Sequence, residues 1–290
     1  MSFAGDLWHL MRPRQWVKSG FVFVGILFAN SWRQPETLER VVAVAVAFSL
    51  VASGVYIFND LFDRQHDLQH PQKKDRPLAS KRIGTGAAIL FLVILWLVGL
   101  TLGVFVSIKV LFILAIYISI NIAYSLGLKH VVLLDVFIIA GGFMLRILAG
   151  TSGIGIAPSQ WLLICGLMAA LFLGFAKRRA ELYALSDENS EHRRVLRNYQ
   201  PVLLDKMIVV TATCVILTYS LYTMSPVTIQ AHHTDALIYT VPFVMYAIFR
   251  YIYSLHNHKT GTDPAQEIFR DPHILISIGG WLLLTVWLIS

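Results

Sequence analysis

The sequence predicts an all-α polytopic membrane protein with about nine transmembrane helices and a cytoplasmic N-terminus. Of its 290 residues, 56% are hydrophobic and only 14% are charged, against about 25% charged in soluble domains. The apolar residues gather in runs near the ~20 residues that a helix needs to span a bilayer, and the basic residues gather on one side of those runs. These observations exclude a soluble globular domain and predict a single transmembrane domain over residues 1–290.

The apolar runs follow one another along the chain and define the predicted spans. They cover roughly residues 15–33, 40–61, 86–107, 109–127, 131–150, 158–176, 206–224, 236–254 and 273–289. Very tight turns around residues 108 and 129 join consecutive spans. No cleavable signal pattern opens the chain, because Arg12 and Arg14 already lie in its first residues. Cys165 and Cys214 fall inside apolar runs, so they predict neither a disulfide framework nor a thiolate metal site.

Lysine and arginine set the predicted orientation. With the N-terminus in the cytoplasm, nineteen basic residues fall on the cytoplasmic side, and only Arg33, Arg40 and Lys109 fall on the other. By the positive-inside rule the N-terminus is inside and the C-terminus outside, in a cell (inner) membrane. The two long polar loops, residues 60–85 and 177–205, then both face the cytoplasm.

The second span ends in Asn59-Asp60-Leu61-Phe62-Asp63-Arg64-Gln65-His66-Asp67. Carboxylates at i, i+3 and i+7 share one face of a continuous helix, where Asp60, Asp63 and Asp67 would repel one another unless a cation lies between them. Mg²⁺ prefers such oxygen ligands and completes its coordination with water and substrate phosphates. The pattern therefore predicts a Mg²⁺ site, although a solvated helix end would account for any single Asp.

Basic residues follow the acidic motif in the first long loop. Pro71 and Pro77 break any helix there, so Lys73, Lys74 and Arg76 are predicted on a turn that can fold back over the carboxylates. Carboxylates that hold Mg²⁺, beside bases that hold phosphate oxygens, are typical of a site for a metal-bound polyphosphate. Ordinary positive-inside charge is the alternative.

The second long loop opens with Lys177-Arg178-Arg179-Ala180-Glu181. Lys177 and Glu181 share a helix face at this i, i+4 spacing. Attraction to anionic lipid headgroups alone accounts for three arginines further along, namely Arg193, Arg194 and Arg197.

Single polar residues add to the predicted site. Lys18 lies about one turn inside the first span, and Tyr124, Lys129 and Asp135 flank the tight turn after the fourth. Arg146 lies within the fifth span, about 16 Å along the axis from Asp135, where an arginine needs a cavity or a partner. Outward snorkelling to the far interface is the alternative for Arg146.

With these residues in view, the chain resembles the UbiA superfamily of membrane prenyltransferases. The resemblance rests on Asn59-Asp60-x-x-Asp63-x-x-x-Asp67, on the spans, and on polar loops after the second and sixth of them. It covers essentially the whole chain. It implies a UbiA-like helical bundle around a central cavity, open to lipid at the side and capped on the cytoplasmic side, and a transferase that uses Mg²⁺ on these aspartates.

The chain departs from the superfamily where a second acidic motif normally follows the sixth span. That place reads Phe175-Ala176-Lys177-Arg178-Arg179-Ala180-Glu181-Leu182, with bases where acids are expected. Here, and in residues 12–18, 70–77, 135–137 and 142–146, the chain resembles the branch that uses phosphoribosyl pyrophosphate as donor and a polyprenyl phosphate as acceptor. Two anionic substrates call for more bases and fewer carboxylates.

The resemblance implies transfer of 5-phosphoribosyl to a polyprenyl phosphate, with release of pyrophosphate. It implies phosphate-binding roles for one set of bases, and ribose or 5-phosphate contacts for a second, smaller set. The first set is Lys18, Lys73, Arg76, Lys177 and Arg178, the second is Tyr124 and Lys129, and Asn59, Asp135, Arg146 and Glu181 complete the expected substrate site.

Two other functions stay open. An aromatic prenyltransferase that uses a polyprenyl pyrophosphate would keep the fold and the first motif, but it calls for a second acidic motif. A lipid-phosphate or anion transporter is disfavoured because the charges crowd one side and no inverted repeat or interrupted pair of helices is apparent. The expected partners are the two anionic substrates and membrane lipids. No feature predicts nucleic-acid binding, and the sequence leaves open whether the chain forms a homo-oligomer.

Overall fold

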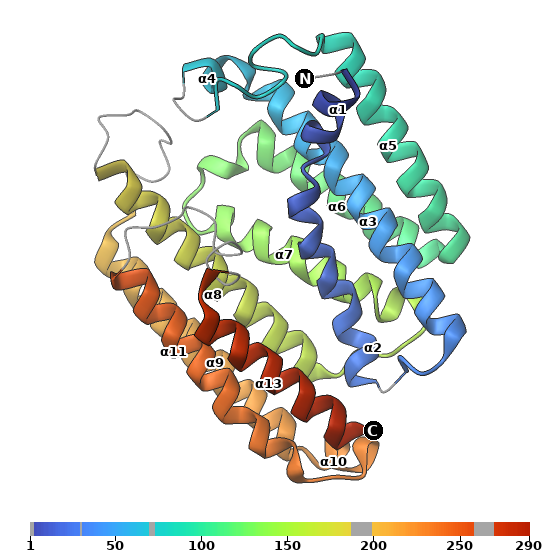
Figure 1. The fold of residues 1–290 in the computed structure, drawn as a ribbon, viewed down its shortest axis with the longest axis vertical. Helices are drawn as coiled ribbons and strands as arrows, with labels where there is room; N and C mark the ends of the chain where they lie inside the picture. The colour runs from blue at the N-terminus through green and yellow to red at the C-terminus, as the bar shows by residue number, and fades with distance from the viewer. Residues whose placement is uncertain (1–2, 30, 70–72, 187–198, 258–269) are drawn as a thin grey trace. The chain divides into compact units, whose positions relative to one another are not determined.

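The computed structural model describes residues 3–29, 31–69, 73–186, 199–257 and 270–290, and the regular elements in these ranges are all helical (Figure 1). Eight helical segments among the described residues are long and apolar enough to cross a membrane. The chain is therefore a multi-pass, all-α membrane protein, as the composition predicts.

The predicted span at residues 15–33 is helical but is not one α-helix. It consists of a 3-10 helix, η1 (Pro13–Phe23), and a short α-helix, α2 (Val24–Phe28). A side chain added at Gly150 would meet the carbonyl oxygen of Val22 at 1.9 Å, and one added at Gly25 would meet the Thr151 side chain at 2.1 Å. This close backbone approach accompanies the irregular helix. Residues 13–28 are not among the eight segments found in the described part of the chain, so the count of nine spans stays a prediction.

The chain divides into two compact units, each with its own core. The first unit comprises residues 1–128 and 145–158. Its helices in chain order are α1 (Phe3–Met11), η1, α2, α3 (Pro35–Phe62), α4 (Arg64–Gln69), α5 (Thr85–Val106) and α6 (Ile108–Leu126), with the short 3-10 helix η3 (Ser152–Ile154) near its end. The predicted single domain over residues 1–290 stays a prediction.

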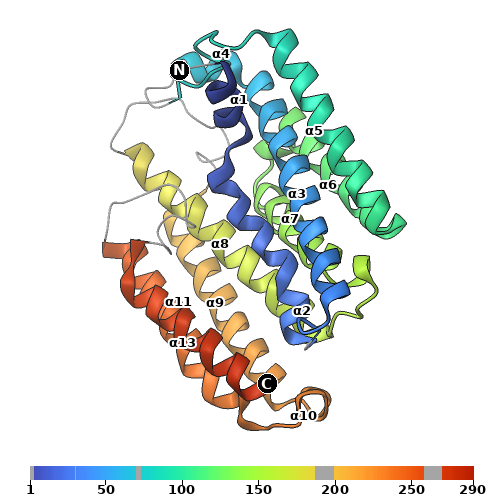
Figure 2. The same cartoon turned by 45° about the vertical axis from the view of Figure 1, so that its right-hand side comes forward.

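Helix α3 is the centre of the first unit. Of its apolar window 67% is buried, against 22% for α5, and α3 and α5 lie side by side in both views (Figures 1 and 2). The indole of Trp96 on α5 covers Gly54 and donates to the carbonyl of Val51 at 3.2 Å. Small residues on α3 thus allow close packing, and the polar C-terminal end of α3 is held in place by its neighbours.

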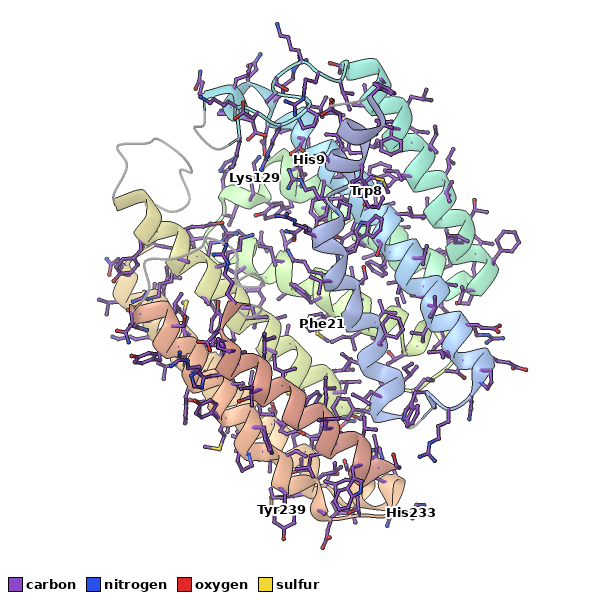
Figure 3. All side chains as sticks on the ribbon, viewed as in Figure 1. Trp8, His9, Phe21, Lys129, His233 and Tyr239 are labelled. Carbon is purple, nitrogen blue, oxygen red and sulfur yellow. The ribbon has the colours of Figure 1, made fainter. Side chains whose placement is uncertain are left out.

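The second unit comprises residues 129–144 and 159–290. Its elements are η2 (Leu128–His130), α7 (Leu134–Ala149), α8 (Gln160–Ser186), α9 (Pro201–Met224), α10 (Pro226–His232), η5 (Ala236–Thr240), α11 (Val241–Asn257) and α13 (Pro272–Ile289). The first residue of η2 and the C-terminal end of α7 belong to the first unit. Helix α8 packs on α9, and α11 packs on α13. His233 and Tyr239 lie at the end of this unit where α10 and η5 join α9 to α11 (Figure 3).

Both predicted polar loops are partly helical. In the first, α4 follows α3 almost at once, and residues 70–72, with His70 and Pro71, lie outside the described part of the chain. In the second, α8 continues to Ser186 and α9 already begins at Pro201, a residue well suited to a first helical turn. Hydropathy marks only the apolar part of a helix, so these ends were predicted too short. Arg193, Arg194 and Arg197 fall outside the described residues.

Candidate active site

Two carboxylates of the acidic motif meet at one arginine in the first unit. Nη1 of Arg76 donates to Oδ1 of Asp60 at 3.0 Å and to Oδ2 of Asp67 at 2.7 Å. Asp60 comes from the end of α3, Asp67 from α4, and Arg76 from the turn that follows α4. The prediction that the basic turn folds back over the carboxylates is confirmed for Arg76.

The acidic motif does not lie on one continuous helix. Helix α3 ends at Phe62, Asp63 caps it with φ −90° and ψ 5°, and α4 begins at Arg64. The prediction that Asp60, Asp63 and Asp67 share one helix face is therefore wrong. Asp60 and Asp67 are brought to the same guanidinium by a bend in the chain and by a tertiary contact.

The donor set at this point fits Mg²⁺. Among the described residues, no group of three His, Cys, Asp or Glu side chains is arranged to hold a metal ion. Asp60 and Asp67, however, already have a cationic nitrogen between them, and Mg²⁺ is commonly held by one or two carboxylates plus substrate phosphates. A ligand set that includes Asp63 stays a prediction.

The surroundings of the buried Asp67 carboxylate shift its pKa in opposing directions. Burial raises its pKa, the guanidinium of Arg76 lowers it, Asp60 raises it, and Lys73 lowers it again. The pKa of Asp67 ends above its ordinary value, so the ionised form is disfavoured by its surroundings. An added positive charge next to Asp67 would favour its ionised form.

A second guanidinium reaches the same carboxylate. Nη2 of Arg12 donates to Oδ1 of Asp60, and the guanidinium of Arg12 lies 5.2 Å from the ring centroid of Tyr56. Sequence reasoning did not assign a role to Arg12. The only signal available was its position directly before the first span, in a segment that the resemblance already singled out.

Asn59 links the end of α3 to α6. Oγ of Ser125 donates to the side-chain oxygen of Asn59, and Ser125 is buried. The neighbouring Tyr124 is half-buried on α6, and Lys18 is half-buried on η1. Roles of Lys18, Asn59 and Tyr124 in substrate binding stay predictions.

Arg146 is buried among aromatic side chains of the first unit. Its guanidinium lies 4.9 Å from the ring centroid of Tyr117 and 5.1 Å from that of Phe48, and Nη2 donates to the Tyr117 hydroxyl at 3.0 Å. The side chain does not snorkel outward, since Arg146 is only 4% exposed. Phe48 precedes Asp60 on α3 by about 18 Å along the axis, so Arg146 lies well away from the carboxylates.

The polar residues of the second unit form a buried network. Nε of Arg178 lies 3.0 Å from Oδ2 of Asp135, although the two atoms are not aligned for a hydrogen bond, and Nη1 of Arg178 donates to Glu181 at 2.5 Å. The hydroxyl of Tyr199 donates to Oδ1 of Asp135 at 2.8 Å and accepts from the Leu133 amide at 2.7 Å. Sequence reasoning did not find Tyr199, which carries no motif of its own.

Burial decides what this network can do. Asp135 is fully buried, and Arg178 is 1% exposed. Burial raises the pKa of the Tyr199 hydroxyl, Asp135 raises it further, and the Leu133 amide opposes the shift. Tyr199 therefore stays protonated as a donor. In this arrangement Asp135, Arg178 and Glu181 bind one another, and their predicted substrate contacts stay predictions.

The remaining bases differ in their surroundings. Arg179 is bound to Asp205 on α9 and donates to the Leu255 carbonyl on α11 at 3.0 Å. Lys177 is half-buried on α8, and Lys129, labelled in Figure 3, is half-buried in η2. Lys177 is therefore the most accessible of the three consecutive bases on α8.

The fold and the site define a polytopic helical membrane protein with a carboxylate–guanidinium site. Residues 19–270 match the UbiA prenyltransferase family, and the chain belongs to that family. It is 29% identical to a decaprenyl-phosphate phosphoribosyltransferase of Corynebacterium glutamicum over 98% of this chain and 87% of that protein. It is also 29% identical to a protein of the same name from Mycolicibacterium smegmatis, over 94% of this chain and 88% of that one.

A solved structure has the same fold. A UbiA homolog from Archaeoglobus fulgidus, bound to DMAPP and Mg²⁺, has a TM-score of 0.74 and 16% sequence identity, over 98% of this chain and 99% of that one. The predicted UbiA-like fold is thus confirmed.

Proposed function

We propose that this protein transfers the 5-phosphoribosyl group of phosphoribosyl pyrophosphate to a polyprenyl phosphate of the decaprenyl type. The bond between ribose C1 and the pyrophosphate oxygen breaks, and pyrophosphate leaves with the electron pair. A phosphate oxygen of the lipid forms the new bond to C1 from the opposite face. Lipid phosphate is already ionised at neutral pH, so the reaction requires no strong general base.

One observation carries the proposal: similarity over nearly the whole chain to two proteins named decaprenyl-phosphate phosphoribosyltransferase. The composition of α8 supports it. Its polar end carries Lys177, Arg178 and Arg179 where a second acidic motif, acting with the first on one metal-bound diphosphate, would require acids. A donor with an additional phosphate and an acceptor that is itself an anion favour a base there, and the half-buried Lys177 is the most accessible one, since Arg178 and Arg179 are paired with acids of the protein.

The residues of the first unit suit the leaving group. Mg²⁺, when bound, would withdraw charge from the leaving pyrophosphate. Asp60 and Asp67 would hold the ion, while Arg76 and Lys73, next to them on the turn after α4, would bind phosphate oxygens. As the bond breaks, ribose C1 acquires oxocarbenium character and negative charge develops on the leaving pyrophosphate. Cations fixed beside the pyrophosphate therefore lower the barrier.

The phosphate of the lipid and the 5-phosphate of the donor need further bases. Lys18 and Lys177 are half-buried and chemically suited to this, and Tyr124 and Lys129 suit contacts to the ribose or its 5-phosphate. We further propose that the chain is a single domain in the inner membrane with its site facing the cytoplasm. The excess of basic residues on that side supports this orientation.

A donor test on purified protein decides the function. One reaction contains polyprenyl phosphate and phosphoribosyl pyrophosphate with Mg²⁺, and the other contains polyprenyl pyrophosphate and a hydroxybenzoate-type acid. The proposal predicts a new phosphoribosylated lipid in the first reaction and none in the second. A prenylated aromatic acid in the second reaction alone would assign the protein to prenyl transfer instead.

A further inference from the structure

Two arginines from different parts of the chain hold the same oxygen of Asp60. Arg12 comes from the segment between α1 and η1, and Arg76 from the turn after α4. Their side chains are 29% and 28% exposed, whereas the side chain of Asp60 is 5% exposed. A buried carboxylate is thus covered by two cations that solvent can reach.

The backbone builds this position for Arg12. Its φ of 51° and ψ of 60° lie in the left-handed region, which is unfavourable for a residue other than glycine. The hydroxyl of Ser53 donates to the Met11 carbonyl at 2.9 Å, and the indole of Trp16 donates to Ser53 at 3.0 Å. Helix α3 therefore fixes the chain on both sides of the bend, and the Arg12 guanidinium reaches Asp60.

The charges of these four side chains cancel. Asp60 and Asp67 supply two negative charges, and Arg12 and Arg76 supply two positive charges. A divalent cation that enters alone meets two guanidiniums already bound to Asp60, and both repel it. A diphosphate brings negative charge, and its oxygens are strong acceptors for guanidinium donors. Metal and diphosphate that enter together keep the site close to neutral.

We propose that Arg12 is a diphosphate-binding residue and that, with Arg76, it makes metal binding depend on the diphosphate. Without diphosphate the two arginines compete with a divalent metal for Asp60. With diphosphate they bind its oxygens and leave Asp60 to the metal. The inference rests on the proposed function only in that the donor carries a diphosphate.

The test measures binding rather than turnover. Mn²⁺ binding to the purified full-length protein is followed by electron paramagnetic resonance, and binding of inorganic pyrophosphate is followed by calorimetry with and without Mn²⁺. In the wild-type protein, pyrophosphate should tighten Mn²⁺ binding. Arg12→Gln should tighten the binding of Mn²⁺ alone by about threefold to tenfold. The same variant should weaken pyrophosphate binding in the presence of Mn²⁺ by about tenfold.

The opposite signs of these two changes distinguish the proposal from a structural role, because a damaged site would bind both probes less well. Arg14→Gln is the matched control, because it also removes one positive charge, from an exposed side chain two residues after Arg12. Its affinities for Mn²⁺ and for pyrophosphate should stay unchanged. Arg12→Lys keeps the charge, so its affinity for Mn²⁺ alone should stay near the wild-type value.

Three results would overturn the proposal. They are unchanged or weaker binding of Mn²⁺ alone by Arg12→Gln, unchanged pyrophosphate binding by that variant, and equal effects of Arg12→Gln and Arg14→Gln. Neither probe contains ribose or lipid. A negative result in the donor test would therefore exclude phosphoribosyl pyrophosphate as the donor, but it would not contradict diphosphate binding by Arg12.

Discussion

The ion pair between Asp135 and Arg178 allows a quantitative test of what the buried charges of the second unit contribute. Asp135→Ala would leave Arg178, which is 1% exposed, with Glu181 as its remaining acidic partner in the network described above. Removing one member of a buried pair costs about 3–5 kcal/mol. The lost hydrogen bond from Tyr199 adds about 1 kcal/mol, while Glu181 offsets part of the loss, so the expected destabilisation stays at about 3–5 kcal/mol.

Two further variants separate charge from hydrogen bonding. Tyr199→Phe keeps both charges but removes the hydrogen bonds to Asp135 and to the Leu133 amide, so we expect a destabilisation of about 1–3 kcal/mol. The double variant Asp135→Asn with Arg178→Gln removes both charges together. It should be destabilised by less than the sum of its single variants, since no uncompensated charge stays buried.

The assay is thermal unfolding of the protein in detergent. A loss of 3–5 kcal/mol corresponds to a fall in the apparent Tm of about 10 °C for a unit of this size. Asp235→Ala is the matched control, because Asp235 is an exposed carboxylate of the same unit, and its Tm should barely change. Equal unfolding temperatures of Asp135→Ala and Asp235→Ala would contradict a stabilising role of the buried pair. So would a double variant whose loss of stability equals the sum of the losses of its single variants.

Three more outcomes are expected. EDTA should abolish turnover and Mg²⁺ or Mn²⁺ should restore it, and Asp60→Ala should reduce turnover by about 10² or more; full activity in a folded Asp60→Ala protein would exclude the metal from this site. Lys177→Ala should raise the KM for donor or lipid phosphate with little change in Tm, whereas Arg178→Ala should mainly lower the Tm, because Arg178 is enclosed by Asp135 and Glu181; equal, small effects would contradict both roles. Ribose 5-phosphate should compete with the donor and geranyl pyrophosphate should compete poorly, and the reverse order of inhibition would favour an aromatic prenyltransferase.

Most of the fold could be predicted from the sequence because each segment that crosses the lipid must be a helix of about 20 mainly apolar residues. The tight turn predicted near residue 108 is present at Ser107, whose hydroxyl caps α6 at the Val110 amide and donates to the Gly153 carbonyl at 2.6 Å. The irregular first span could not be predicted. It accompanies the close approach of Val22 and Gly150, two residues far apart in sequence, and no local pattern signals that contact.

The site was predictable in its chemistry and less so in its geometry. Opposite charges predicted that Arg76 would reach the acidic motif, and it does. The bend at Asp63 was missed because i, i+3, i+7 spacing assumes a continuous helix. The contact of Arg12 with Asp60 was missed because it depends on a left-handed backbone conformation at Arg12 and on the hydrogen bond from Ser53 to Met11, which are tertiary effects.

Burial divides the arginines of this protein into two kinds. Arg12 and Arg76 contact buried carboxylates but are themselves more than a quarter exposed, so a phosphate oxygen can reach either guanidinium, provided that another cation then compensates the buried Asp60. Arg178 is 1% exposed, and replacing its partners would leave buried charges uncompensated at a cost of several kcal/mol. The basic pattern on α8 is therefore not a uniform phosphate clamp. Arg178 links α8 to the start of α7 through Asp135, and we propose the half-buried Lys177 beside it as the base that binds substrate phosphate.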